Sequence, residues 1–474
     1  SKNMRKIHLL IIFLVNLSFG QTCTGGFAGV YPCNNIDLQS RINFPEMGGT
    51  SGTQGNDCWG WTDPLTNKEY AIMCCTSHTA FLDITNPTAP IYLGKVVSTN
   101  NISSIWRDAK VYNNYVFIVS EAAGHGMQVF DLTRLRNITT PQVFSVDAFY
   151  SGFGNCHNIA INETTGFAYC IGSNTFSGGP HVVNIQNPLN PVFSFGYSSQ
   201  AYTHDAQIII YNGPDTEHVG KEIYFGANEN KVVVIDVTNK NNPILLSTFT
   251  YSNVEYTHQG WLTTDSKYWI VGDELDETDF GFNTKSIIID MSNLDAPVLK
   301  GNYFGTTPSI DHNGYTLNNE FYLANYRAGL RIMNTSNIET SSNMNEIAFF
   351  DTYPASNSAQ FNGAWSTYPY FASGNILISD IERGLFIVKK NAALSFQEFE
   401  KDSFKISPNP STDFFTIDSK FEIQNLEIFD VVGKKVKEYN NLNTNSYTVN
   451  LDEFTSGLYF VKINNSTTLK LIVK

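Results

Sequence analysis

The chain has 474 residues, which is long enough for two or three domains. Charged residues make up 16%, aromatic residues 14%, and there are 34 glycines, a composition that favours an all-β protein with many short strands. With 30 basic and 44 acidic residues the net charge is −14; this field repels phosphate backbones, so we expect no nucleic-acid partner.

The N-terminal segment has the pattern of an export signal. Arg5 and Lys6 precede an apolar run over residues 7–17 that is too short to cross a bilayer. We predict a signal peptide over residues 1–20, with Met4 as the initiator. No later run of residues is long and apolar enough for a transmembrane helix, so none is expected in the mature chain.

Export makes disulfides possible, and the chain has seven cysteines. Antiparallel strand ends that lie opposite each other can be bridged, so cysteines that flank predicted hairpins are candidate partners. One cysteine is left unpaired, and buried free thiols are the alternative. The candidate pairs are Cys23 with Cys33, Cys58 with Cys74 or Cys75, and Cys156 with Cys170.

A repeat of about fifty residues organises most of the chain. Each unit contains a short apolar strand, then Asp or Asn, then a polar turn with proline, most clearly at residues 81–90, 183–191, 235–243 and 289–297. Seven units with room for four strands each predict a seven-bladed β-propeller over residues 21–390; a β-solenoid needs shorter coils. The units begin at Cys58, Arg107, His157, His204, His258, His312 and Phe361.

The seventh unit lacks an outer strand after residues 384–389. An open ring would expose strand edges, which proteins avoid. Residues 35–42 lie before the first unit, and we predict that they supply the missing strand and close the ring.

The last part of the chain forms a separate predicted module. Residues 391–403 have the character of a linker, and apolar residues alternate over 404–474, which indicates a small β-sandwich. Its motifs resemble the type IX secretion system (type A) sorting domain of Bacteroidetes. The resemblance implies handling by the type IX machinery, passage through periplasm and outer membrane, removal of this domain, and a secreted or cell-surface product. The motif residues are Pro408, Asn409, Pro410, Gly433, Gly457 and Lys474.

The propeller itself resembles the choice-of-anchor B family. The resemblance implies a propeller fold and a cell-surface location, and it brings no defined catalytic residues. The matching stretches are residues 58–64, 106–112, 120–134, 202–207, 256–261, 273–277, 311–314 and 324–331.

The repeat places four histidines at equivalent positions, so their imidazoles should approach one axis; they are His157, His204, His258 and His312. A transition-metal or anion site at the channel mouth is one hypothesis, because imidazole suits such metals. The other is that each histidine bonds the backbone of a neighbouring blade. Asp108 and Asp205 lie one position later; strand alternation would turn only one of the two sets to the channel, unless the strand starts are bulged.

The acidic loop over residues 273–279 is a second candidate site. Its carboxylates could bind calcium, or the loop could be a solvated surface segment. Asp273 and Glu274 directly follow a predicted strand, so they could contribute to one face of the propeller.

Aromatic residues at the unit starts, among them Trp59, Trp61, Trp261 and Trp365, could stack on sugars or pack in the core. Residues 120–126 contain Ser, Glu and His but no nucleophile elbow. The sequence therefore favours a secreted binding or interaction module for an extracellular ligand or protein. The alternative is a metal-dependent extracellular hydrolase or lyase that uses the histidine cluster.

Overall fold

The computed structural model describes residues 20–391, 404–431, 433–464 and 467–474. The chain divides into two compact units, one up to Asn391 and one from Ala392. The predicted signal peptide, apart from Gly20, and the predicted linker, apart from Asn391, lie outside the described residues.

The first unit consists of sheets that are antiparallel except for the short strand β11 on β7, and those in the described residues number seven. Each has four core strands in chain order from the inner strand outwards, and the last takes its fourth strand from the N-terminus. The first four sheets are β4 (Gly55–Thr62), β5 (Glu69–Cys75), β6 (His78–Asp83) and β7 (Ile91–Val97); β8 (Arg107–Tyr112), β9 (Tyr115–Ser120), β10 (Met127–Asp131) and β12 (Ala148–Tyr150); β13 (Asn158–Asn162), β14 (Phe167–Ile171), β15 (His181–Asn184) and β16 (Val192–Gly196); and β17 (Asp205–Ile210), β18 (Glu222–Ala227), β19 (Val232–Asp236) and β20 (Ile244–Phe249).

The remaining sheets complete the unit. Short strands extend two sheets at their outer edges: β11 (Gln142–Phe144) joins β7, and β1 (Phe27–Ala28) and β2 (Tyr31–Asn34) join β28. The α-helices of the described residues are α1 (Asp276–Phe280) and α2 (Ile338–Ser341). The last three sheets are β21 (Thr257–Leu262), β22 (Tyr268–Asp273), β23 (Lys285–Asp290) and β24 (Val298–Phe304); β25 (Gly314–Leu317), β26 (Glu320–Ala324), β27 (Leu330–Asn334) and β28 (Asn345–Phe350); and β29 (Ala364–Tyr368), β30 (Asn375–Asp380), β31 (Gly384–Lys390) and β3 (Ile36–Ile42).

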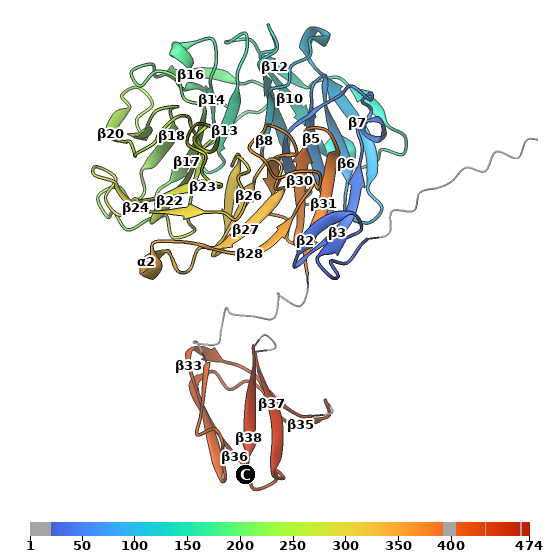
Figure 1. The fold of residues 1–474 in the computed structure, drawn as a ribbon, viewed down its shortest axis with the longest axis vertical. Coiled ribbons are helices and arrows are strands. Elements are labelled where there is room, and N and C mark those ends of the chain that lie inside the picture. Colours follow the sequence, from blue (N-terminus) through green and yellow to red (C-terminus); the bar gives the residue numbers. More distant parts are fainter. Residues whose placement is uncertain (1–19, 392–403, 432, 465–466) are drawn as a thin grey trace, which may run out of the picture. The chain divides into compact units, whose positions relative to one another are not determined.

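The sheets are arranged in a ring around a common axis. Each inner strand contacts the inner strand of the next sheet, from β4 through β8, β13, β17, β21 and β25 to β29, and β29 contacts β4 again. In Figure 1 the colours accordingly make one circuit, and the blue β3 lies beside the orange β31. The all-β prediction of a propeller is confirmed.

Apolar layers between adjacent sheets form the core of the ring. Because each sheet is covered on both faces, its middle strands are almost entirely buried; all seven residues of β5 are buried. Between the first two sheets, the Phe81 and Phe130 rings stack with centroids 4.9 Å apart, and Phe144 packs against both. Each sheet therefore depends on its neighbours for burial of its apolar side chains.

The N-terminal segment covers the last two sheets. Strand β3 pairs with β31, so residues 36–42 form the fourth strand of the last sheet, and β2 pairs with β28. Ile36 is fully buried in this position. The predicted disulfide Cys23–Cys33 is confirmed and ties the start of the segment to β2.

The other predicted disulfides are wrong: Cys58, Cys74, Cys156 and Cys170, like Cys75, are buried free thiols. Across strands Cys58 pairs with Met73, so Cys58 and Cys74 face the apolar layers on opposite sides of their sheet. Cys156 precedes β13, and its Sγ lies 3.1 Å and 3.2 Å from two backbone carbonyl oxygens. Burial raises the pKa of Cys58, Cys74 and Cys156.

The second unit is a sandwich of two sheets. One contains β32 (Phe404–Ser407), β33 (Phe414–Ile423) and β36 (Thr444–Asn450); the other contains β34 (Leu426–Asp430), β35 (Lys435–Tyr439), β37 (Gly457–Ile463) and β38 (Thr467–Val473). Buried side chains from both sheets, including Phe415, Ile428 and Val461, form its own core. The predicted β-sandwich is confirmed.

The motif residues of the second unit lie at turns and at the last strand. Asn409 Oδ1 accepts a hydrogen bond from the Ile472 N–H (2.9 Å), and its Nδ2 donates to the Lys470 carbonyl (2.6 Å). The Lys474 N–H donates to the Ser411 carbonyl, so the segment with Pro408 and Pro410 is tied to the C-terminal strand. Gly433 has φ = 82°, a conformation that favours glycine, and Gly457 begins β37.

Candidate functional site

The starts of the inner strands bring four histidines together at one end of the channel. His157, His204, His258 and His312 come from successive sheets, and the centroids of neighbouring rings lie 4.3, 4.1 and 4.4 Å apart. We call these four residues the histidine arc. Histidines that occupy equivalent positions of the repeat, about fifty residues apart in the chain, are therefore in contact in the structure.

Backbone carbonyls of the next sheet fix the tautomers of two members of the arc. His204 Nδ1 bonds the His258 carbonyl oxygen (2.9 Å), and His312 Nδ1 bonds that of Trp365. A carbonyl oxygen only accepts hydrogen bonds, so each Nδ1 carries the proton. These two contacts are of the interblade kind that the second hypothesis predicts, and they leave Nε2 of both rings free of a proton.

The other two members differ. His157 Nδ1 lies 2.6 Å from Glu121 Oε1, a residue of the loop after β9. His258 is 1% exposed, and its Nδ1 has no hydrogen-bond partner among the described residues. His258 is therefore the least satisfied imidazole of the arc.

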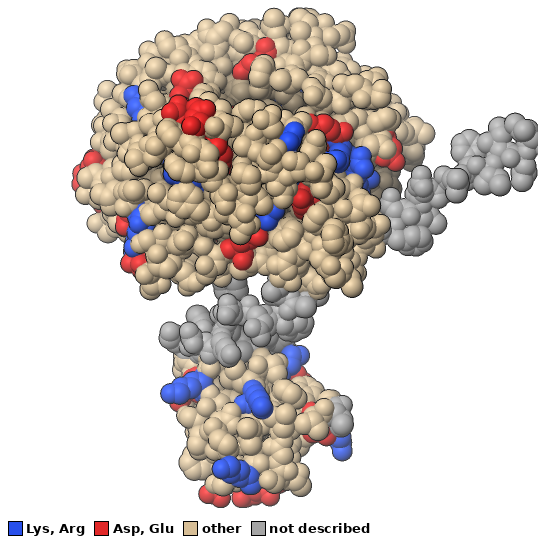
Figure 2. Space-filling model, viewed as in Figure 1, with Lys and Arg blue, Asp and Glu red and all other residues tan. Residues whose placement is uncertain are grey.

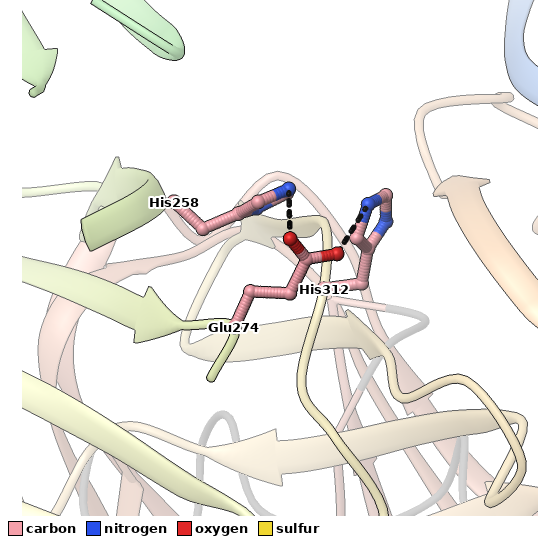
Figure 3. Close-up of side chains that lie close together, drawn as sticks. All are labelled: His258, Glu274 and His312. Atoms are coloured by element: carbon pink, nitrogen blue, oxygen red, sulfur yellow. Dashed lines mark ion pairs between the residues drawn. The ribbon is translucent and has the colours of Figure 1, made fainter. Parts of the chain in front are cut away.

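Glu274 directly follows β22 and reaches between two imidazoles of the arc (Figure 3). Its Oε2 lies 3.8 Å from His258 Nε2 and its Oε1 3.6 Å from His312 Nε2. The Tyr326 hydroxyl donates to Glu274 Oε1 (2.6 Å) and orients the carboxylate. His258, Glu274 and His312 lie in or beside β21, β22 and β25 and converge on one point.

Burial sets the charge of this end of the channel. It raises the pKa of Glu274 to about 7 and lowers the pKa of His312 to about 3. Burial also lowers the pKa of His204 and His258 well below the usual value for histidine. These imidazoles are therefore neutral at physiological pH, the form in which histidine binds metals.

A layer of buried charges follows the arc along the channel. Lys110 Nζ lies 2.5 Å from Asp108 Oδ1, and Asp108 Oδ2 accepts from the Ile159 N–H of the next sheet (2.9 Å). Burial raises the pKa of Asp57 to about 6 and that of Asp205 to about 8. The predicted residues Asp108 and Asp205 thus belong to one buried group with Lys110 and Asp57. Lys110 and Asp57 were not identified from the sequence as members of this group.

Strand pairing shows that the predicted alignment of the repeats is wrong at two units, the first and the last. In β21 the ladder skips His258 between Thr257 and Gln259, and in β29 it skips Trp365 in the same way. Trp365, not Phe361, is therefore the structural counterpart of His258. In the first sheet the bulge lies between Gly55 and Cys58, and Asp57 occupies the position of Asp108.

An aromatic pocket opens at the other end of the same inner strands. Its volume is about 650 Å³. Along β21, Trp261 comes three residues after His258, which corresponds to about 10 Å of strand. Lys110 and Asp205 also line the pocket, so it reaches the charged layer. The aromatic residues of its lining are Trp59, Trp261, Tyr315, Tyr368 and Tyr370.

Most carboxylates of the acidic loop are buried rather than solvated: Asp273, Asp276 and Glu277 are buried, and only residues 278–280 are exposed. Asp273 accepts hydrogen bonds from the Tyr251 hydroxyl and from two backbone N–H groups, and it is fully buried. Asp276 Oδ2 lies 2.7 Å from Lys285 Nζ, and Glu277 accepts from the Lys285 N–H. These contacts hold the turn and α1 together, while Asp276 Oδ1 and Glu277 Oε2 have no hydrogen-bond partner among the described residues.

The predicted tryptophan candidates divide between core and channel. Trp61 is buried against Tyr70, whereas Trp59 and Trp261 line the aromatic pocket. Trp365 packs on His312 at the opposite end, with centroids 4.7 Å apart. A further group of possible metal ligands, Asp215, His218 and Asp295, was missed because those residues come from distant loops.

Charged side chains are sparse on the face of the first unit shown in Figure 2, where Lys and Arg lie scattered among uncharged residues. Within the described residues, no helix has the length and apolar character needed to cross a membrane.

Residues 405–474 match the family model described as the secretion system C-terminal sorting domain. This match confirms the resemblance to type IX sorting domains and indicates export to the cell surface or beyond, with handling by the type IX machinery. Residues 220–250 and 282–304 match the LVIVD repeat, and no curated protein matches the chain.

The chain is similar to several solved structures at low identity. One is PorZ, a bacterial surface component of the type IX secretion system of Porphyromonas gingivalis, with 12% identity over 88% of this chain and a TM-score of 0.47. This chain spans 59% of the length of the PorZ chain. The C-terminal WD40 domain of Sif2 matches with 7% identity and a TM-score of 0.47. The match covers 75% of this chain and 98% of that chain. The extracellular domain of a putative one-component system of B. thetaiotaomicron matches with 11% identity and a TM-score of 0.46. The match covers 92% of this chain and 58% of that chain.

Proposed function

We propose that this chain is an exported binding module whose propeller holds a carbohydrate in the aromatic pocket of its channel. The observation that carries the proposal is the lining of the pocket, in which five aromatic side chains surround a polar floor. Its volume of about 650 Å³ lies in the range of small-molecule sites, which is about 300–1,000 Å³.

The aromatic side chains are held by one another and keep part of their surface free. Trp59 packs edge-on against Tyr315 and Tyr368, and Trp261 packs edge-on against Tyr315. Trp59 and Trp261 are only half-buried. Indole faces fixed in this way suit the apolar C–H faces of sugar rings.

Polar groups at the base of the pocket complement sugar hydroxyls. Lys110 carries donors and Asp205 carries acceptors, and both line the pocket. The Lys110 ammonium also lies over the Trp59 ring, 4.6 Å from its centroid. Stacking faces beside paired donors and acceptors favour a neutral, hydroxyl-rich ligand over a polyanion.

Trp261→Ala tests the proposal. In calorimetric titrations with oligosaccharides first identified on a glycan array, the variant should bind about 10-fold or more weakly, because a stacking face is lost. Trp106→Ala is the matched control: Trp106 is a 40% exposed tryptophan beside His157, at the other end of the channel, and its loss should leave affinity unchanged.

Two results would refute carbohydrate binding in the pocket. One is a wild-type protein that binds no glycan on the array. The other is equal affinity of Trp261→Ala and the wild type. Circular dichroism must show both variants folded; Trp261→Phe, which keeps a smaller ring, is the substitute if the alanine variant is not.

The proposed route of export completes the function. Residues 1–20 act as the signal peptide, 21–390 form the propeller closed by residues 35–42, 391–403 form the linker, and 404–474 are removed after crossing the outer membrane. Membership of the propeller in the choice-of-anchor B family is part of the proposal, supported by the LVIVD matches. The alternative function, a metal-dependent hydrolase or lyase, depends on whether the histidine arc binds a metal.

A further inference from the structure

The contacts of Glu274 with His258 and His312 are too long for hydrogen bonds. The separations of 3.8 Å and 3.6 Å exceed the distances of N–H···O bonds, which end near about 3.2 Å. Both oxygens of the carboxylate nevertheless face an imidazole Nε2, one on each side (Figure 3). The three groups surround a point rather than bond to one another.

The tautomer of His312 makes this arrangement unfavourable without a positive charge. Because Nδ1 donates to the Trp365 carbonyl, Nε2 of the neutral ring carries a bare lone pair. That lone pair faces Glu274 Oε1, which is itself an acceptor. Two acceptors that face each other in a buried site repel, and a cation between them removes the repulsion.

The spacing agrees with metal coordination. Ligand atoms about 2.1 Å from one ion lie roughly 3.4–3.6 Å apart in tetrahedral or trigonal geometry. The two separations from Glu274 are 3.6 and 3.8 Å, and all the ligand atoms of the three residues lie within 4.8 Å of one another. A small inward movement of these side chains would complete the coordination.

The surroundings of His258, Glu274 and His312 have features that are common around metal ligands. Metal-bound histidines commonly donate their second N–H to a backbone carbonyl, as His312 does to Trp365. Ligating carboxylates are commonly hydrogen-bonded in turn, as Glu274 is by Tyr326. The imidazole side chains of His258 and His312 are 1% and 3% exposed, but that of Glu274 is 16% exposed, which leaves a way in for an ion.

We propose that His258, Glu274 and His312 form a binding site for a first-row divalent transition metal such as Zn²⁺. Two imidazole nitrogens and one carboxylate oxygen are a ligand set that zinc and non-haem iron sites use. Three protein ligands leave an open coordination position, which a water molecule or an oxygen of a channel ligand can fill. His204 stands beside the site and supports it through its bond to the His258 carbonyl.

Titration of the chelator-treated, dialysed full chain with Zn²⁺ alone tests the proposal. Calorimetry and elemental analysis should find one tightly bound zinc per chain. Glu274→Gln keeps the size of the side chain and an acceptor for Tyr326 but loses the charge, and it should weaken zinc binding at least about 100-fold. Tyr326→Phe removes only the supporting hydroxyl and should weaken it by about 10-fold.

His218→Gln is the matched control. His218 also lies between two carboxylates, Asp215 and Asp295, but it bonds Asp295 directly at 2.9 Å. Zinc binding should be unchanged in this variant. Zinc that is lost in His218→Gln and kept in Glu274→Gln would place the metal at that other cluster and overturn the proposal.

A measurement on the wild type keeps the test independent of folding in the variants. X-ray absorption of the zinc-loaded protein should show two imidazole nitrogens and at least one oxygen around the metal. A wild type that takes up no zinc, with a proton held between Glu274 and His312 instead, would also overturn the proposal. Glycan binding in the aromatic pocket is measured separately and does not depend on this outcome.

Discussion

At the scale of single residues, the buried carboxylate of Asp63 is paired across the boundary between the first two sheets. Asp63 lies in the turn after β4, and its carboxylate accepts hydrogen bonds from Nε and Nη2 of Arg136 (2.8 and 2.7 Å), which lies just after the short 3₁₀ turn that follows β10 of the second sheet. Its own turn supplies two more donors, the Leu65 N–H and the Thr66 hydroxyl. The Arg136 guanidinium holds the pKa of Asp63 well below its usual range.

Asp63→Asn should lower the free energy of unfolding by about 2 kcal/mol at pH 7, because charge-assisted hydrogen bonds to a buried group are lost. The pKa of Asp63 is depressed in the folded state, so its contribution is complete above the unfolded value of about 3.9 and disappears as the pH falls through the folded value. Urea unfolding at pH 7 and at pH 3 should show the difference between variant and wild type shrinking at the lower pH.

Asp147→Asn serves as the control for this experiment. Asp147 pairs with Arg134 in a similar way but both side chains are partly exposed, at 24% and 34%. Its removal should cost less than about 1 kcal/mol. Equal losses for the two variants, or a pH-independent loss for Asp63→Asn, would contradict the assignment.

At the scale of elements, the N-terminal segment adds strands to the last two sheets of the propeller. Residues 20–42 provide β3 for the last sheet and β2 for the one before it. Without β3, the backbone groups of β31 would form an unpaired edge, which invites aggregation. The apolar side chains of Ile36 and Leu38 would also leave the core that they share with Phe386.

A chain that starts at Asn43 should therefore aggregate or melt at least about 5 °C lower than the chain that keeps residues 20–42, as size-exclusion chromatography and a thermal melt would show. The double variant Cys23→Ser/Cys33→Ser separates the strand from the crosslink. It keeps β2 and β3 and should lose only the contribution of a short disulfide loop, about 2–3 kcal/mol. If the truncated chain melts like the wild type, β3 does not stabilise the ring.

At the scale of the whole molecule, the two units have separate cores. The apolar clusters of the propeller contain residues up to Val388, and that of the sandwich contains residues from Phe404 onwards. Each unit thus has a core of its own and the burial it needs to fold by itself.

Truncation after Asn391 should block export and leave the folded propeller in the periplasm of a bacterium that has the type IX system. Cell fractionation with immunoblotting measures the location, and the full-length chain in the same strain is the control. The melting temperature of the truncated propeller should equal that of the propeller in the full chain. Release of the truncated chain to the medium would show that residues 404–474 are not required.

Much of the fold was predictable because most sheets of a propeller are formed by one continuous stretch of the chain. Strand alternation and proline-containing turns recur about every fifty residues, and the period alone indicates the ring. The four histidines were identified in the same way, because equivalent positions of successive repeats lie at the same height around the axis. The alignment went wrong at Cys58 and Phe361 because short matches, Gly-Trp at 60–61 and Asn-Gly at 362–363, lie a few residues away from the true structural counterparts.

By itself, the sequence determined the all-β class, the repeat, the sorting domain, the Cys23–Cys33 pair and the equivalence of His157, His204, His258 and His312. Only the tertiary structure decided that Glu274 reaches between His258 and His312, that Tyr326 orients it, and that Cys58 and Cys74 face opposite layers. The physical reason is that the periodic sequence pattern predicts which strands pair within one sheet. Contacts between sheets depend instead on loops of irregular length and on which face of each strand is turned toward its neighbour.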